Sequence, residues 1–194
     1  MLRWIVRTAA IALCALLVAG CAAGPRLFVN READLSYYKR IAVLPFANLA
    51  GDPNAGERVT RAFVTELFIA ERFEMVDPGE FRGVLDIAGG LPDAQGNVDP
   101  AKLKDAAARV QATAVIRGAV TEYQLTRAGT NDVPVVGFTV EMVDATDPAK
   151  VVWRVQSTRR GKSRVPVLGG AASFGTVTQD LCRDVVARLQ RSAF

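Results

Sequence analysis

The side chains of this chain best suited to covalent or acid–base chemistry are three cysteines and twenty acidic residues, because the sequence contains no histidine. The lack of histidine excludes Ser-His-Asp and Cys-His catalysis and removes the commonest metal ligand. Too few cysteines are present for a zinc site built on thiolates. Asp86, Asp99, Asp105 and Glu122 lie in different segments with no spacing that pairs them, and no Gly-x-x-x-x-Gly-Lys or Gly-x-Ser-x-Gly motif is present. We therefore expect no enzyme, no metal site, no cofactor and no small-molecule substrate.

Cys21 is the cysteine whose surroundings predict a reaction. Arg3 and Arg7 precede an apolar run over residues 9–19, and a basic head before such a run is typical of a secretory signal peptide. The run is shorter than the roughly 20 apolar residues that a membrane-spanning helix needs. Its end, Val18-Ala19-Gly20-Cys21, resembles the lipobox of bacterial lipoproteins.

The lipobox resemblance implies that the sulfur of Cys21 receives a diacylglyceryl group, that residues 1–20 are removed as a signal peptide, and that the new amine is acylated. The alternatives are an ordinary cleaved signal with a chance cysteine, or an uncleaved anchor. Three long acyl chains exceed the two signals that stable membrane anchoring requires. Ala22 follows the cysteine, at the position where aspartate retains enterobacterial lipoproteins in the inner membrane. We therefore expect an anchor in the outer membrane and a domain that faces the periplasm.

The remaining 174 residues have the composition of one water-exposed domain. Loss of Arg3 and Arg7 leaves 22 basic against 20 acidic residues, so the charge gives no reason to expect nucleic acid. Cys14 leaves with the signal and Cys21 becomes a thioether. Cys182 is then the one free thiol, and we expect it to be a small core residue.

Hydrophobic periodicity predicts nine elements in the order β-α-β-α-α-β-β-β-α. The Asp77-Pro78 and Asp99-Pro100 pairs each indicate a helix start, because aspartate caps and proline suits the first helical position. Pro45 is expected near a strand end, and Gly118 at a bulge or a close backbone approach. The predicted strands cover residues 40–46, 73–76, 113–124, 136–144 and 151–156, and the predicted helices cover 57–72, 77–88, 99–110 and 174–191.

This order, with several segments, resembles the CsgG-like envelope lipoproteins, a group that includes the curli-secretion channel subunit and the LpoB-type activators of peptidoglycan synthases. The matching segments are residues 41–46, 73–77, 114–120 and 152–153. The resemblance implies one α/β domain over residues 38–194, with a mixed β-sheet packed with helices. Residues 21–37 are expected to form a lipid-anchored tether, in which Leu27-Phe28-Val29 are apolar enough to dock on the domain.

Two segments bear on pore formation, because the channel subunit carries two extra amphipathic hairpins that build its barrel. A spanning hairpin needs roughly 20 residues plus a turn. The candidate insertion points, residues 125–134 and 159–173, are shorter and do not alternate apolar with polar residues. We therefore expect no pore.

A basic segment is the best candidate for partner binding. Residues 159–173 are expected to form a loop that holds Arg159, Arg160, Lys162 and Arg164. These four residues would contact an acidic partner or an anionic envelope polymer, and the alternative is a solvated surface. The sequence thus predicts a non-catalytic binding or assembly factor of the cell envelope, accessory to secretion or peptidoglycan synthesis, with an envelope protein partner or self-association. The alternative function is a subunit of a CsgG-type oligomeric secretion channel in the outer membrane.

Overall fold

Both predicted Asp-Pro helix starts are present in the computed structural model, which describes residues 24–129, 131–162 and 172–194. The Asp77 carboxylate accepts a hydrogen bond from the Glu80 amide (2.9 Å) and begins α3 (Pro78–Ile87). The Asp99 carboxylate accepts from the Ala101 amide (2.8 Å) and begins α4 (Pro100–Arg109). Each cap satisfies amide groups that have no partner within the helix.

Two longer helices show the four-residue apolar stripes that the sequence predicts. Helix α2 (Ala55–Ala70) buries Val59, Phe63 and Leu67. Helix α5 (Phe174–Ala193) buries its own stripe together with Cys182, which is fully buried. The expectation that Cys182 is a core residue is therefore confirmed.

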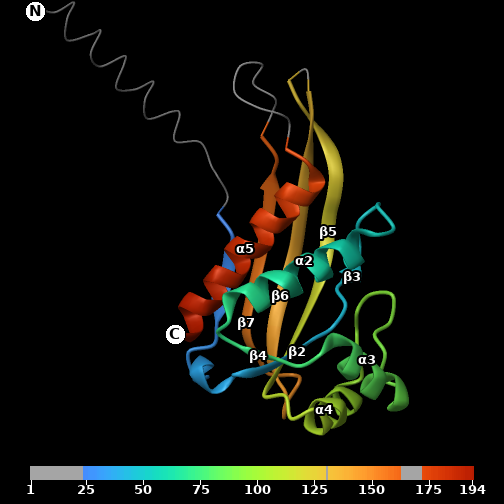
Figure 1. The fold of residues 1–194 in the computed structure, drawn as a ribbon, viewed down its shortest axis with the longest axis vertical. Coiled ribbons are helices and arrows are strands. Elements are labelled where there is room, and N and C mark those ends of the chain that lie inside the picture. The colour runs from blue at the N-terminus through green and yellow to red at the C-terminus, as the bar shows by residue number, and fades with distance from the viewer. Residues whose placement is uncertain (1–23, 130, 163–171) are drawn as a thin grey trace, which may run out of the picture.

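The strands form one mixed sheet, as predicted, in the order β1-β7-β6-β5-β2-β4, with β3 paired to β5 (Figure 1). β2 and β3 run parallel to β5, and β4 runs parallel to β2. β5, β6, β7 and β1 form an antiparallel meander. The strands are β1 (Arg26–Val29), β2 (Arg40–Val43), β3 (Ala47–Asn48), β4 (Glu74–Met75), β5 (Ala114–Ala128), β6 (Asn131–Asp144) and β7 (Val151–Arg160).

Pro45 and Gly118 have the positions that their chemistry predicts. β2 ends at Val43, and the chain returns to the same edge of β5 as β3 after Pro45. A Cβ atom on Gly118 would lie 3.1 Å from the Phe46 ring and 2.7 Å from the Thr139 carbonyl oxygen. Gly118 therefore marks a close approach of the Phe46 ring, and the bulge of β5 lies further along, between Val120 and Glu122.

The helices cover the two faces of the sheet unequally. α2 and α5 pack on one face, over a core that contains Phe63, Phe138 and Trp153. α3 and α4 pack on the other face and reach β5 and β6 only near Val115 and Val143. The rest of that second face, formed by the middle of β5, β6 and β7, is called the open face below.

Four segments differ from the sequence prediction. The predicted strand over residues 40–46 ends at Val43, and residues 47–48 form the separate strand β3. Arg26–Val29, placed in the expected tether, form β1 and pair with β7. β5 and β6 extend four and five residues further toward their shared turn than predicted. Arg159 and Arg160, expected in a loop, belong to β7, because their backbone pairs with Val136 and Val135 of β6. Backbone pairing with an adjacent strand decides these positions and outweighs their polar side chains.

Candidate functional site

Glu141 lies between two arginines on the open face. The register places Arg117 of β5 and Arg154 of β7 directly beside Glu141 of β6. The Nε atoms of Arg117 and Arg154 donate to Oε1 and Oε2 of Glu141, at 2.5 and 2.6 Å. Glu141 is only 8% exposed, and a buried carboxylate needs such partners. Because one carboxylate serves two guanidinium groups, the cluster keeps an excess of one positive charge.

This cluster forms one wall of a hollow of about 340 Å³, called the open-face pocket. Gly118, Ala119 and Thr139 also line it, and residues 95–98 form its rim. The rim is held by Asp93, which accepts hydrogen bonds from the side chain and the amide of Asn97 (3.0 and 2.8 Å). These bonds hold the pKa of Asp93 below its ordinary value.

The chemistry of the open-face pocket suits recognition. Each guanidinium has five N–H donors, so Arg117 and Arg154 keep donors beyond those that Glu141 accepts. Planar guanidinium groups bind carboxylates, phosphates and other polar acceptors with defined geometry. The pocket can therefore bind a polar or anionic group of a partner.

A cavity of about 290 Å³ with a mainly apolar lining adjoins the open-face pocket, and Gly96 lines both. Leu44, Phe46, Phe81 and Leu85 are among the residues that line this cavity. Gly96 has a φ of +82°, and a Cβ atom there would lie 2.7 Å from Cβ of Ala47. Only glycine fits between the two hollows without strain.

The described part of the chain contains no group of three or more His, Cys, Asp or Glu residues that could hold a metal ion. Burial raises the pKa of the Cys182 thiol, so this side chain is a poor nucleophile. Within the same residues, no helix is long and apolar enough to cross a bilayer.

The four basic residues predicted to bind a partner have different environments. Arg159 forms ion pairs with Asp184 and, at 3.6 Å, with Asp180 of α5. Arg160 and Lys162 are exposed and form no ion pair with any residue that the structure describes. Arg164 and the predicted lipidation residue Cys21 lie outside the described residues. Partner binding by this segment stays a prediction that rests on Arg160 and Lys162.

None of the residues that line the open-face pocket was predicted as a site residue. Strict alternation places Glu141 and Arg154 on the wetter side of the predicted meander. The cluster itself depends on register, because a shift of one residue would turn Glu141 to the opposite face. Sequence reasoning missed the whole cluster for that reason.

Comparisons with known proteins support the fold. No family model matches the sequence, and neither does any curated protein. PelC from Paraburkholderia phytofirmans, solved as a dodecamer, aligns with a TM-score of 0.59 at 24% identity, over 86% of this chain and 96% of PelC. The lipoprotein GNA1162 from Neisseria meningitidis aligns with a TM-score of 0.57 at 17% identity, over 79% of this chain and 99% of GNA1162. At these identities the similarity shows a shared fold and says nothing about activity.

The LpoB C-terminal domain from Escherichia coli aligns with a TM-score of 0.46 at 13% identity, over 63% of this chain and 82% of that domain. This score is too low to support an argument about function. Among the neighbours reported with TM-scores above 0.5, GNA1162 is a lipoprotein. The more specific resemblance to CsgG-like proteins stays a prediction.

Proposed function

We propose that this protein is a lipid-anchored, non-catalytic binding or assembly factor of the bacterial cell envelope. The observation that carries the proposal is a lipobox cysteine directly ahead of a domain with the fold of the lipoprotein GNA1162. Only residues 22–25 separate Cys21 from β1. A lipid on Cys21 would therefore hold the domain close to the membrane.

The open-face pocket is the best surface for partner binding. It combines a hollow, a net positive cluster and an adjacent apolar cavity. A central apolar cavity beside polar donors resembles the anatomy of protein interfaces. The site would accept an extended chain of an envelope protein that carries an acidic side chain next to an apolar one.

Lipid attachment is tested by the substitution Cys21→Ala in the producing cell. Labelled fatty acid should be incorporated into the parent protein and not into the variant, and only the parent should fractionate with membranes. A variant that keeps both the label and its membrane fraction would contradict the proposal. Separation of inner from outer membranes then tests the expected outer-membrane location.

Partner binding is tested by photo-crosslinking from the lipidated protein in membranes. Gln156 is exposed and follows Arg154 by two residues on the same face of β7, so a photoreactive side chain there should capture the partner. The matched control is the same side chain at Ile87, which is 83% exposed on α3. The substitution Arg154→Glu should abolish the adduct at position 156. An adduct of equal yield from position 87 would argue against the open face.

A second candidate function is a subunit of an oligomeric assembly, and one observation favours it. β1 is an edge strand whose Leu27 and Phe28 are 46% and 50% exposed. Exposed apolar edges pair readily with other chains, and PelC forms a dodecamer. The mass of the lipidated protein in detergent, measured by light scattering, distinguishes a monomer from a ring.

A further inference from the structure

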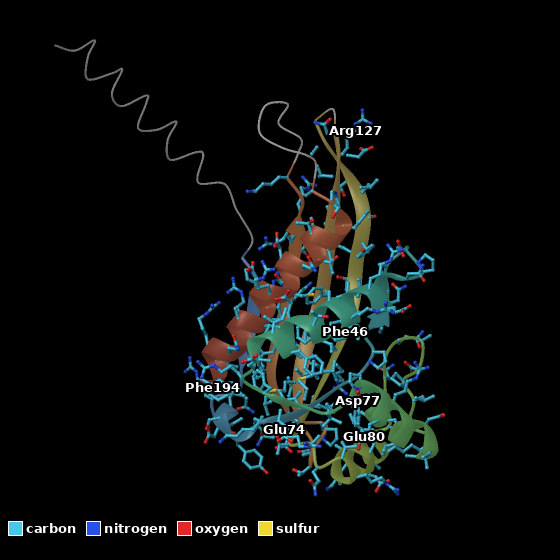
Figure 2. The ribbon with its side chains drawn as sticks, in the orientation of Figure 1. Phe46, Glu74, Asp77, Glu80, Arg127 and Phe194 are labelled. Atoms are coloured by element: carbon cyan, nitrogen blue, oxygen red, sulfur yellow. The ribbon has the colours of Figure 1, made fainter. Side chains whose placement is uncertain are left out.

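The direction in which the chain enters the sheet relates Cys21 to the basic residues of β7. β1 pairs antiparallel with β7, and Arg26 lies opposite Gln156. The chain that precedes Arg26 therefore comes from the end of the sheet where β7 finishes at Arg160. The turn of the β5–β6 hairpin, with Arg127, lies at the same end (Figure 2).

Chain geometry limits how far Cys21 can lie from this end. Arg26 follows Cys21 by five positions, so the two Cα atoms are at most about 18 Å apart. Arg160 lies four residues beyond Gln156, which is about 13 Å along the strand. Arg160 pairs with Val135 and Arg127 pairs with Asp132, so Arg127 lies a further 10 Å or so along the sheet. The hairpin tip thus extends as far as the lipidated cysteine can reach, or further.

The side chains at this end carry a net positive charge. Arg127, Arg160 and Lys162 are exposed. Asp132 lies opposite Arg127 and offsets one of these charges. Arg159 pairs with Asp180 and Asp184 of α5, and Arg183 also pairs with Asp180, so these two arginines balance the two aspartates. Leu125, on the same hairpin, is 59% exposed.

We propose that the tip of the β5–β6 hairpin and the last residues of β7 lie on the anionic surface of the bilayer that holds the lipid of Cys21. The inference rests on the proposed function, because it requires acylated Cys21. Anionic headgroups attract Arg127, Arg160 and Lys162, and the attraction is screened over about 8 Å at physiological salt. Leu125 enters the boundary between headgroups and acyl chains, as apolar residues of interfacial segments do. The opposite end of the sheet, with α3 and α4, then faces away from the membrane.

The test uses tryptophan fluorescence in the mature lipidated protein, reconstituted in vesicles of phosphatidylglycerol and phosphatidylcholine with brominated acyl chains. Leu125→Trp reports on the hairpin, and Ile87→Trp, on exposed α3, is the matched control. Trp153 is fully buried and supplies the same background in both proteins. Bromine should quench Leu125→Trp about twofold or more above Ile87→Trp, because only the hairpin enters the interface.

Charge reversal tests the role of the basic residues. In the Leu125→Trp protein, combined Arg127→Glu, Arg160→Glu and Lys162→Glu substitutions should remove most of the excess quenching. Three exposed residues distant from the hairpin provide the control, in which Lys39→Glu, Arg82→Glu and Lys104→Glu should leave the quenching unchanged. In vesicles of phosphatidylcholine alone, the Leu125→Trp protein should show the same low quenching as the charge-reversed protein.

The possible results distinguish failure of this inference from failure of the proposed function. Acylated protein with equal quenching at positions 125 and 87 overturns this inference and leaves the proposed function intact. Excess quenching that is the same in neutral vesicles overturns the role of the anionic surface. Mass spectrometry that finds no acyl group on Cys21 overturns the proposed function and this inference with it.

Discussion

The hydroxyl of Tyr38 donates a hydrogen bond to the carboxylate of Asp144, with 2.9 Å between Oη and Oδ2. Tyr38 follows the 3₁₀ turn Leu35–Tyr37, and Asp144 ends β6. Burial, followed by this hydrogen bond and the nearby charge of Asp144, raises the pKa of Tyr38. Burial acts to raise the pKa of Asp144 too, but hydrogen bonds from Thr146 and Tyr38 outweigh it and hold that pKa below its ordinary value. The contact thus joins the segment between β1 and β2 to the end of β6.

The raised pKa of Tyr38 predicts a loss of stability at alkaline pH. Its folded pKa lies above the ordinary value of 10, so this stabilisation is complete below pH 10 and is lost as the pH rises beyond it. Tyr38→Phe should lower the free energy of unfolding at pH 7 by about 1 kcal/mol and should flatten its decline above pH 10. Urea unfolding between pH 7 and pH 11 measures both. Tyr37→Phe, at a residue that is 59% exposed, is the control, and an unchanged alkaline decline in Tyr38→Phe would refute the assignment.

Gly118→Ala should destabilise the domain by about 1–3 kcal/mol. The added methyl group would lie 2.7 Å from the Thr139 carbonyl oxygen and 3.1 Å from the Phe46 ring, so the backbone or the ring must move. Gly83 lies in α3 with nothing within 4 Å of an added Cβ. Gly83→Ala should therefore be neutral or stabilise by up to about 1 kcal/mol. Thermal unfolding of both variants gives the comparison, and equal stability of the two would contradict the close approach.

The Arg117–Glu141 pair should couple more strongly than the Arg154–Glu141 pair. The Arg117 side chain is 27% exposed and that of Arg154 is 53% exposed, so water screens the second pair more. Double-mutant cycles with alanine should give about 1 kcal/mol for Arg117–Glu141 and less for Arg154–Glu141. Glu57 and Arg61, an exposed pair on α2, serve as the reference, with at most about 0.5 kcal/mol. The reverse order of the two coupling energies would show that Arg154 is the main partner of Glu141.

Cys182 should not react with a thiol reagent in the native protein. The side chain is fully buried and burial raises its pKa, while reaction requires an accessible thiolate. In urea at pH 8 the mature protein should release one equivalent of thiol, from Cys182. Cys182→Ala should release none in either state. A second equivalent in urea would mean that Cys21 carries no lipid.

Helix positions could be predicted because their signals are local. Asp77 and Asp99 cap helices with the side chains that the sequence shows, and the stripe on α5 follows from spacing alone. β1 has no such local signal, because its four residues do not alternate apolar with polar side chains. They form a strand because β7 offers them an unpaired edge. The same holds for β3, which has two residues.

The open-face pocket was beyond prediction for a related reason. Arg117 and Arg154 lie 24 and 13 positions from Glu141 in the sequence. Only the register of the three strands brings these side chains together. The sequence shows the basic segment, but it does not distinguish the environments of its members. The pairing of Arg159 with Asp184 separates it from Arg160 and Lys162, and that pairing depends on how α5 crosses β7.

The pairing of β1 with β7 also sets an order for folding. Arg26 and Gln156 lie far apart in the chain, and closing so long a loop is slow compared with forming hairpins or helices. In a chain exported from its N-terminus, β1 could not pair until β7 had crossed the membrane. β1, which begins five positions after Cys21, would then stay unpaired while the chain emerges. The proposed lipidation of Cys21 would have that interval in which to take place before the edge of the sheet is completed.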